Sequence, residues 1–371
     1  MKRTFVKATS LFSPPLIILS LLSLIMMQSC KKNISEEPQS TVAGKDPKSL
    51  KDFRQVNLVG NNTEYNPARV DPVFINGWGI AMSPTGTIWI SAEASGVSVV
   101  YNKDGNQVLP PVSIPSHGGP TGGHPTGQVF NAGAGFRLPN GNPARFIFAG
   151  ADGIISAWNG GSAAIKMIDD SPDAAYLGLA IANDGPNKFI YAANFSEGAI
   201  DVYDTAWNEV SKPFSDPNMP TGYSPFNIQN IDGMLYVMYA KVGSDGEEEV
   251  GPGNGYVDIY TAAGSLVKRL VSRGQLNAPW GVAKAPASFW GDDGLPDIIL
   301  VGNFGDGHIN AYNSNGDFVG QLRKSGNPIV IEGLWGISFP PVTATTINPN
   351  WLYFAAGPDD EEEGLFGYIT K

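Results

Sequence analysis

Three tryptophan–glycine pairs are the residues of this chain whose types and spacing best suit a binding site. Trp78, Trp280 and Trp335 are each followed directly by glycine, and each stands near the start of a similar phrase. An indole ring offers a flat apolar face for stacking, and its N–H can donate a hydrogen bond. The three pairs therefore predict a site for a neutral polar ligand, a glycan or a peptide.

Amide and carboxylate side chains accompany these pairs. Asn76, Asn277 and Glu332 stand two or three residues before the tryptophans. Oxygen atoms of this kind are the ligands that Ca²⁺ takes in proteins, so the same place offers a second version of the site, in which these three residues bind one divalent cation. Further polar residues follow strand-like runs and are expected beside the ligand: Asn194, Glu197, Asn303 and Asp306.

Other chemistry finds less support in the sequence. His117 and His124 are seven residues apart in a Gly/Pro-rich stretch. They could reach one metal ion, but the interpretation we favour is a solvated surface loop. The chain has neither a phosphate-binding glycine loop nor a Gly-x-Ser-x-Gly nucleophile elbow. Cys30 is its single cysteine, which excludes thiol catalysis in the part that follows. No catalytic residue can be assigned.

The first 30 residues resemble a bacterial lipoprotein signal. A basic start at Lys2, Arg3 and Lys7 precedes an apolar run, and Cys30 follows directly. We expect cleavage after Ser29 and an acylated Cys30 that anchors the chain in outer-membrane lipid, on the periplasmic side or at the cell surface. The alternative is an uncleaved membrane anchor with an incidental cysteine. Residues 30–50 are polar, lack apolar periodicity and read as a flexible tether.

Charge excludes one class of partner. The net charge is −11, and removal of residues 1–29, which hold three basic and no acidic residues, makes it −14. Binding to nucleic acid requires a basic face for the phosphates, so we expect no nucleic-acid partner. We expect a monomer.

A repeat covers the remainder of the chain. A glycine turn followed by a short strand that usually ends in an aromatic residue recurs at intervals of 45 to 57 residues, and the turn glycines are Gly96, Gly153, Gly198, Gly255, Gly307 and Gly364. Repeats of this length that are made of short strands are typical of β-propellers, with one blade per repeat. Residues 51–371 therefore predict an all-β fold, a six-bladed β-propeller.

The order of strands within a repeat predicts where the candidate residues lie. Each repeat opens with a Gly-rich phrase suited to the crowded innermost strand, and a β-branched, aromatic run follows it. The sixth repeat lacks a fourth run, and Phe53–Val59 matches one, so we expect this N-terminal strand to close the last blade. The tryptophans stand where innermost strands begin, which places them at the mouth of the central channel.

The stretch 277–322 resembles an NHL-type repeat. The shared elements are Pro-x-Gly-Val-Ala, a strand that ends in Asn-Phe, then Gly-x-Ile-x-x-Tyr and a final Gly-x-Phe. Residues 53–371 resemble a family of uncharacterised bacterial secreted propellers, some of which carry PEP-CTERM tails. That resemblance implies a fold and export, but no reaction.

Three functions remain open at this point. The first is a binding module for a polar ligand at the channel mouth. The second is a metal-dependent hydrolase, because gluconolactonase-type propellers are similar and hold one axial metal through Glu, Asn and Asp. A catalytic Asp at the start of an innermost strand is missing from this sequence. The third is a structural protein of the cell envelope.

Overall fold

The computed structural model describes residues 50–371, apart from the side chains of Asp292 and Asp293, and this part of the chain is built mainly from β-strands. The predicted signal (1–29) and tether (30–50) lie outside the described residues, save for Leu50. Within the described part, the 3-10 helix η2 spans Ala287–Asp293, and Leu50 also has a 3-10 conformation. In this part no helix has the length and apolar character needed to span a bilayer.

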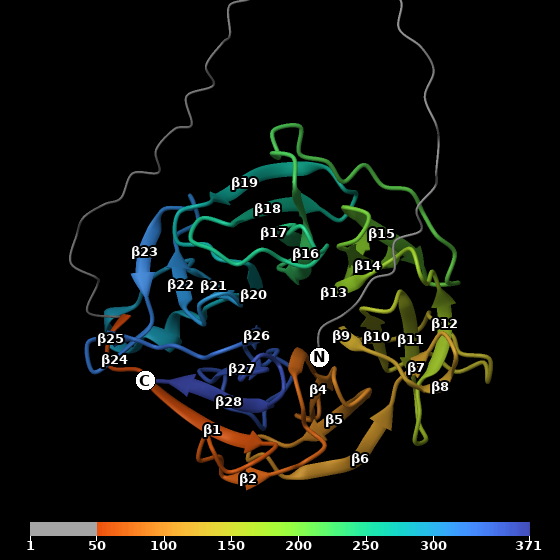
Figure 1. Cartoon of the computed structure of the whole chain (residues 1–371), viewed down its shortest axis with the longest axis horizontal. Coiled ribbons are helices and arrows are strands. Elements are labelled where there is room, and N and C mark those ends of the chain that lie inside the picture. Colours follow the sequence, from red (N-terminus) through yellow and green to blue (C-terminus); the bar gives the residue numbers. More distant parts are fainter. Residues whose placement is uncertain (1–49) are drawn as a thin grey trace, which may run out of the picture. The chain divides into compact units, whose positions relative to one another are not determined.

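Six antiparallel sheets follow one another along the chain, and each is one blade (Figure 1). Blade one, from the innermost strand outward, consists of β3 (Gly77–Met82), β4 (Ile88–Ala92), β5 (Val97–Tyr101) and β6 (Gln107–Ser113). Blade two consists of β9 (Pro125–Phe130), β10 (Phe146–Gly150), β11 (Ile154–Trp158) and β12 (Ile165–Asp169). Blade three consists of β13 (Tyr176–Asp184), β14 (Asn187–Asn194) and β15 (Ala199–Asp204). In blade three a single bridge between Tyr203 and Glu209 stands in place of a fourth strand.

The last three blades follow the same order. Blade four consists of β16 (Tyr223–Ile231), β17 (Met234–Lys241), β18 (Gly255–Thr261) and β19 (Leu266–Ser272). Blade five consists of β20 (Pro279–Lys284), β21 (Ile299–Asn303), β22 (Ile309–Tyr312) and β23 (Phe318–Gln321). Blade six consists of β26 (Leu334–Ser338), β27 (Leu352–Ala356), β28 (Leu365–Thr370) and, as its outer strand, β1 (Arg54–Gly60). Five short strands lie outside these sets: β2 (Arg69–Val70), which pairs with β1, and the pairs β7 (Pro115–Ser116) with β8 (Gly119–Gly122) and β24 (Arg323–Lys324) with β25 (Asn327–Pro328). The predicted six-bladed propeller is confirmed.

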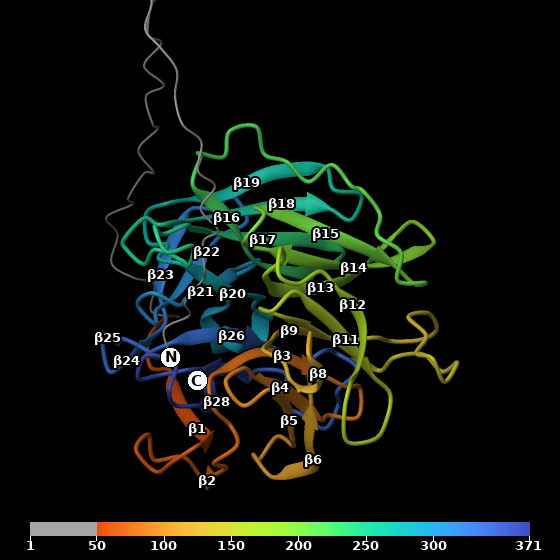
Figure 2. The ribbon, with the colours of Figure 1, turned by 45° about the vertical axis from the view of Figure 1, so that its right-hand side comes forward.

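The innermost strands form a ring around the axis, and β9, β13, β20 and β26 lie near the middle of the oblique view in Figure 2. Each contacts the innermost strands of both neighbouring blades, in the cycle β3–β9–β13–β16–β20–β26. Glycine permits this crowding: a Cβ atom at Gly336 would lie 2.5 Å from the carbonyl oxygen of Trp78, and one at Gly281 would lie 2.7 Å from that of Trp335. The predicted role of these glycines is therefore confirmed.

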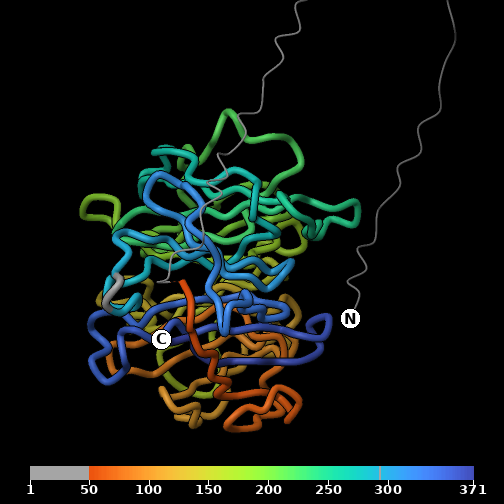
Figure 3. The backbone as a smooth tube through the Cα atoms, turned by 90° about the vertical axis from the view of Figure 1, so that its left-hand side faces the viewer, coloured from red at the N-terminus to blue at the C-terminus, as the bar shows by residue number. Residues whose placement is uncertain are grey.

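The N-terminal strand closes the ring as predicted. β1 pairs antiparallel with β28, from Arg54 opposite Thr370 to Gly60 opposite Leu365. Figure 3 shows the start of the described chain running against its last strands. Leu50 and Phe53 insert into the apolar cluster between blades five and six. Closure thus pairs what would otherwise be the open edge of β28.

A buried charged cluster lies in blade four. On β18, Asp258 accepts a hydrogen bond from Arg269 Nε at 3.2 Å, and Arg269 also contacts Asp216. Both carboxylates are almost fully buried. Burial raises the pKa of Asp258 to about 7, although the Arg269 guanidinium opposes this increase. The folded protein therefore holds a proton that the unfolded chain has released above pH 4.

This proton predicts a pH-dependent stability. Because the pKa of Asp258 is higher in the folded state, its contribution is present below pH 4 and is lost as the pH rises through 7. Between pH 5 and 8, we expect the free energy of unfolding of Asp258→Asn to fall less steeply than that of the wild type, by about 1–3 kcal/mol. Urea unfolding at several pH values measures this. Asp232→Asn, which removes an exposed carboxylate paired with Lys284, is the control. Parallel curves for the wild type and Asp258→Asn would contradict the assignment.

Candidate functional site

The same backbone contact recurs at one face of all six blades. The residue directly after the second strand donates its N–H to the carbonyl of the residue directly before the first strand, at N···O distances of 2.8–3.0 Å. The six donor–acceptor pairs are Glu93–Asn76, Ala151–His124, Phe195–Ala175, Val242–Gly222, Phe304–Ala278 and Gly357–Gly333. We call the face of the propeller that carries these six contacts the N-face, and the face at the opposite end of the central channel the C-face.

Polar side chains at these twelve equivalent positions are confined to blades one and two. Among the donors, blade one has Glu93, whereas the equivalent residues of the other blades are alanine, phenylalanine, valine and glycine. Among the acceptors, blades one and two have Asn76 and His124, whereas the equivalent residues of the other four blades are alanine or glycine. Since the backbone contact itself needs no particular side chain, the three polar residues are not explained by the fold. They are also in direct contact with one another.

A continuous chain of hydrogen bonds links the axis to His124. Asn76 Nδ2 donates to Glu93 Oε2 at 2.9 Å, and the other carboxylate oxygen of Glu93 lies 2.8 Å from His124 Nδ1. On the axial side, Trp335 Nε1 donates to Asn76 Oδ1 at 3.2 Å. The Glu93 side chain is 6 % exposed and that of His124 is 51 % exposed. A buried carboxylate thus orients a half-exposed imidazole.

A second buried carboxylate belongs to the same region. Asp152 follows β10, and both of its carboxylate oxygens are buried without a well-aligned hydrogen-bond donor. A Cβ atom placed on Gly150 would lie 2.4 Å from Asp152 Oδ1 and 3.3 Å from the carbonyl oxygen of His124, so the two residues adjoin. Burial raises the pKa of Asp152, while the charge of His124 and nearby backbone amides oppose the increase.

The three predicted tryptophans converge on the axis, as expected from their place in the repeat. Trp78 and Trp335 stack with ring centroids 3.4 Å apart, and Trp280 meets both edge-on. However, they are only 1–3 % exposed. Together with Phe226 and Phe304, which also pack on Trp335, they form an aromatic plug in the channel. The predicted open funnel with free indole faces is therefore wrong: these rings stack on one another.

Asn194, Asn303 and Asp306 contact their own turns. Asn194 Nδ2 donates to Glu197 and Asp201, and Asn303 Nδ2 donates to Asp306 Oδ1 at 3.1 Å. Both asparagines are fully buried. They hold the turn between the second and third strands, and their contact with a ligand stays a prediction.

The three residues of the predicted cation site have separate partners. Asn76 bonds to Glu93 and Trp335, Asn277 Oδ1 accepts from the Gly251 amide at 2.7 Å, and Glu332 accepts from the Asp359 amide. Within residues 50–371, no cluster of three His, Cys, Asp or Glu side chains could hold a metal ion. The cation site stays a prediction that these contacts do not support.

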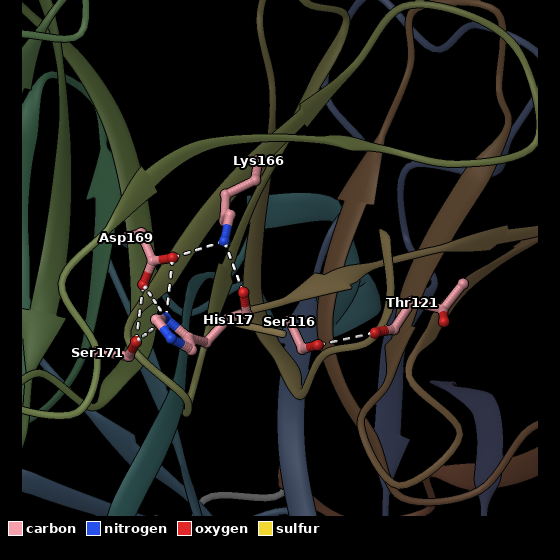
Figure 4. Close-up of polar contacts among 6 residues, drawn as sticks. All are labelled: Ser116, His117, Thr121, Lys166, Asp169 and Ser171. Atoms are coloured by element: carbon pink, nitrogen blue, oxygen red, sulfur yellow. Dashed lines mark hydrogen bonds and ion pairs between the residues drawn. The ribbon is translucent and has the colours of Figure 1, made fainter. Parts of the chain in front are cut away.

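His117 belongs to an exposed cluster on the rim (Figure 4). Its Nδ1 lies 2.9 Å from Ser171 Oγ and 3.1 Å from Asp169, while Lys166 Nζ lies 2.6 Å from the same carboxylate. Hydrogen bonds, first that from Lys166, hold the pKa of Asp169 well below its usual range. A catalytic triad requires the serine and the carboxylate on opposite ring nitrogens. Here both contact Nδ1, so the cluster fastens the hairpin β7–β8 to β12.

A cavity of about 310 Å³ lies on the axis between the aromatic plug and the C-face. All six innermost strands contribute to its wall, and none of its lining residues is ionisable. Trp280 is part of the wall, with the carboxamides of Gln128, Asn227, Gln229 and Asn230. Three of these donate to backbone carbonyls of neighbouring strands: Gln128 to Gly79, Asn227 to Trp280 and Asn230 to Ile181. Rigid amides thus line an uncharged chamber.

Sequence reasoning missed Glu93 and Asp152 and set His124 aside as a solvated loop. The signal that could have found them is the repeat itself. Aligning the residues before each first strand and after each second strand shows where blades one and two depart from the small and apolar residues of the others. Glu93 and His124 are 31 positions apart in the sequence, so their contact appears only when blades one and two lie side by side.

Comparisons with known proteins place the chain among uncharacterised relatives. No family model matches it. It is 34 % identical over 340 residues to the uncharacterised protein L690 of Acanthamoeba polyphaga mimivirus, covering 85 % of this chain and 86 % of the relative. The uncharacterised protein R648 of the same virus is 32 % identical over 336 residues, covering 85 % and 80 %. The predicted membership of a bacterial secreted family stays a prediction.

Among solved structures, virginiamycin B lyase from Staphylococcus aureus matches with a TM-score of 0.49 and 14 % identity, over 86 % of this chain and 99 % of that chain. A streptogramin B lyase structure matches with a TM-score of 0.49 and 12 % identity, over 85 % and 97 %.

Proposed function

The chain belongs to the family of the uncharacterised mimivirus proteins L690 and R648, and on that premise we propose that it is an exported, lipid-anchored binding module. Its ligand, a small neutral polar molecule such as a glycan unit or a short peptide, occupies the axial cavity. The sequence predicted a ligand site at the end of the channel that carries the tryptophans. Because the aromatic plug fills that end, we place the site at the other end, towards the C-face.

One observation carries this proposal. The cavity has four carboxamide side chains and no ionisable group in its wall. Each carboxamide has four hydrogen-bonding positions, and hydrogen bonds within the protein use part of those of Gln128, Asn227 and Asn230. An uncharged wall disfavours ionic ligands, because a buried ion would lack a partner. The volume of about 310 Å³ lies at the small end of ligand sites, which span about 300–1,000 Å³.

Filling the cavity is expected to abolish binding. Gln229 is half-buried on β16, and in Gln229→Trp an indole would occupy the space of the ligand. Titration calorimetry with uncharged mono- and disaccharides and uncharged dipeptides should find a ligand whose affinity falls at least tenfold in this variant. Gln107→Trp, on the exposed strand β6, is the matched control. Equal binding by both variants, or no binding across the panel, would refute the cavity as the site.

The anchor makes a separate prediction. Cys30 lies outside the described residues, and its acylation rests on the order basic–apolar–cysteine. We expect intact-mass spectrometry of protein extracted from membranes to find Cys30 at the N-terminus with the added mass of its lipid. Cys30→Ala should leave residues 1–29 attached or release the protein from the membrane fraction. A wild-type protein that retains residues 1–29 would contradict the proposal of a lipid anchor.

A further inference from the structure

The polar side chains in the wall of the axial cavity differ in how far the fold already uses them. In Gln128, Oε1 accepts a hydrogen bond from Ser98 Oγ at 3.0 Å, and Nε2 donates to a backbone carbonyl of β3 at 2.7 Å. In Asn227, Oδ1 accepts from the amide of the next residue and Nδ2 donates to the Trp280 carbonyl, both at 2.8 Å. Both carboxamides are almost fully buried, so they stiffen the wall and offer little to a ligand.

Three more polar groups of the wall also have partners within the protein. Asn230 Nδ2 donates to the Ile181 carbonyl at 2.8 Å, and its Oδ1 accepts from the Gly233 amide at 2.9 Å. Ser338 Oγ donates to the carbonyl of the next residue at 3.2 Å. Trp280 Nε1 donates to a carbonyl of β13 at 3.1 Å. These groups therefore hold neighbouring strands and turns of the ring together.

Gln229 is the exception among the polar residues of the wall. It stands on β16 two residues after Asn227, is half-buried and lines the cavity. Within residues 50–371 its carboxamide makes no hydrogen bond, so both its oxygen and its nitrogen are available. A ligand in the cavity therefore meets one carboxamide that presents an acceptor and a donor side by side.

Apolar side chains occupy much of the remaining wall. Among them, Ile80, Phe130, Ile181 and Phe339 are half-buried. They offer contact area to carbon atoms, but their side chains form no hydrogen bond. A sugar ring carries hydroxyl groups on most of its carbons, and a hydroxyl that leaves water without finding a partner costs free energy. The wall thus favours a ligand that has one polar edge and apolar surface elsewhere.

We propose that the cavity binds a small cyclic amide, a lactam, and that Gln229 selects it. In a small ring the amide is cis, so its N–H and C=O lie on one edge. The ligand N–H donates to Gln229 Oε1, Gln229 Nε2 donates to the ligand carbonyl, and the ring carbons contact the apolar wall. An open-chain peptide bond is trans, with N–H and C=O on opposite sides, so it can form just one of these two bonds. The inference rests on the proposed function, because it takes the axial cavity as the site.

Caprolactam and N-methylcaprolactam are a matched pair of probes, because methylation removes the N–H donor and keeps the ring. In titration calorimetry with the full chain, we expect the methylated probe to bind at least about tenfold more weakly, since it leaves Gln229 Oε1 without a donor. Gln229→Met keeps the length of the side chain and removes both hydrogen-bonding atoms. In this variant caprolactam should bind more weakly, and the two affinities should agree within about twofold. Gln107→Met, on the exposed strand β6, is the control and should keep the wild-type ratio.

Three outcomes overturn this inference: equal affinity of the wild type for the two probes, binding of neither probe, or a ratio that persists in Gln229→Met. Gln229→Trp, which fills the cavity, separates such a failure from a failure of the proposed function. If a saccharide or an open-chain dipeptide binds the wild type and is lost in Gln229→Trp, the cavity is the site and the lactam assignment alone is wrong. If Gln229→Trp leaves the binding of every ligand unchanged, the cavity is not the site and both proposals fail.

Discussion

Deletion of residues 50–60 is expected to lower the free energy of unfolding by at least about 5 kcal/mol, or to prevent folding. The segment carries the buried side chains of Leu50, Phe53, Leu58 and Val59. Burial of each large apolar side chain contributes about 1.5–3 kcal/mol. The deletion also removes every partner of β28 on its outer edge, from Arg54 to Gly60, and exposes that edge to other chains. Urea unfolding of the full chain, followed by circular dichroism, measures the loss.

Two point variants on the same strand separate closure from mere shortening. Val59→Asp places a carboxylate at a fully buried position that pairs with Phe366 and should reproduce most of the loss. Arg54→Asp alters an exposed residue at the start of β1 and should change stability by less than about 0.5 kcal/mol. An unchanged unfolding midpoint in the deletion variant would mean that blade six is stable without β1.

The architecture could be predicted because its signals are local. Glycine adopts a positive φ without a steric cost, and four of the six turn glycines do so: Gly96, Gly153, Gly198 and Gly307, with φ values of 65°, 77°, 69° and 66°. Such glycines, spaced one blade apart, mark the hairpin between the second and third strands. The closing strand was predictable for a different reason: the last repeat is one strand short, and Phe53–Val59 has the pattern of the missing strand.

The site could be predicted only in part, because side-chain burial depends on contacts across the ring. The repeat placed Trp78, Trp280 and Trp335 at equivalent positions, and their convergence follows from that. Whether their faces stay free depends on Phe226 and Phe304, which come from other segments and fill the remaining space. An aromatic side chain near an axis packs on its neighbours when the channel is narrow enough, which sequence spacing does not report.

Polar contacts between blades were beyond the sequence for a similar reason. Glu93 begins the turn between β4 and β5, while His124 directly precedes the first strand of the following blade, after a Gly/Pro-rich connection. Composition alone made that connection read as solvated loop. The same reasoning was adequate for His117, whose partners are exposed. It failed for His124, because its partner is buried.

Trp335→Ala is expected to destabilise the propeller by about 3–5 kcal/mol, the usual cost of truncating a large buried aromatic side chain. Trp335 stacks on Trp78 at 3.4 Å and on Phe304 at 4.0 Å between ring centroids, and it meets Trp280 edge-on. Removing the indole would leave a cavity that the innermost strands cannot close, because their backbones already touch at Gly281 and Gly336.

Two further variants divide this loss into its parts. Trp351, directly before β27, stacks on Tyr368 at 4.0 Å but is only half-buried, so Trp351→Ala should cost about 1 kcal/mol. Trp335→Phe keeps an aromatic ring and removes the donor to Asn76 Oδ1, which should cost about 1–2 kcal/mol. If Trp335→Ala unfolds at the same urea concentration as Trp351→Ala, the aromatic plug is not a main source of stability.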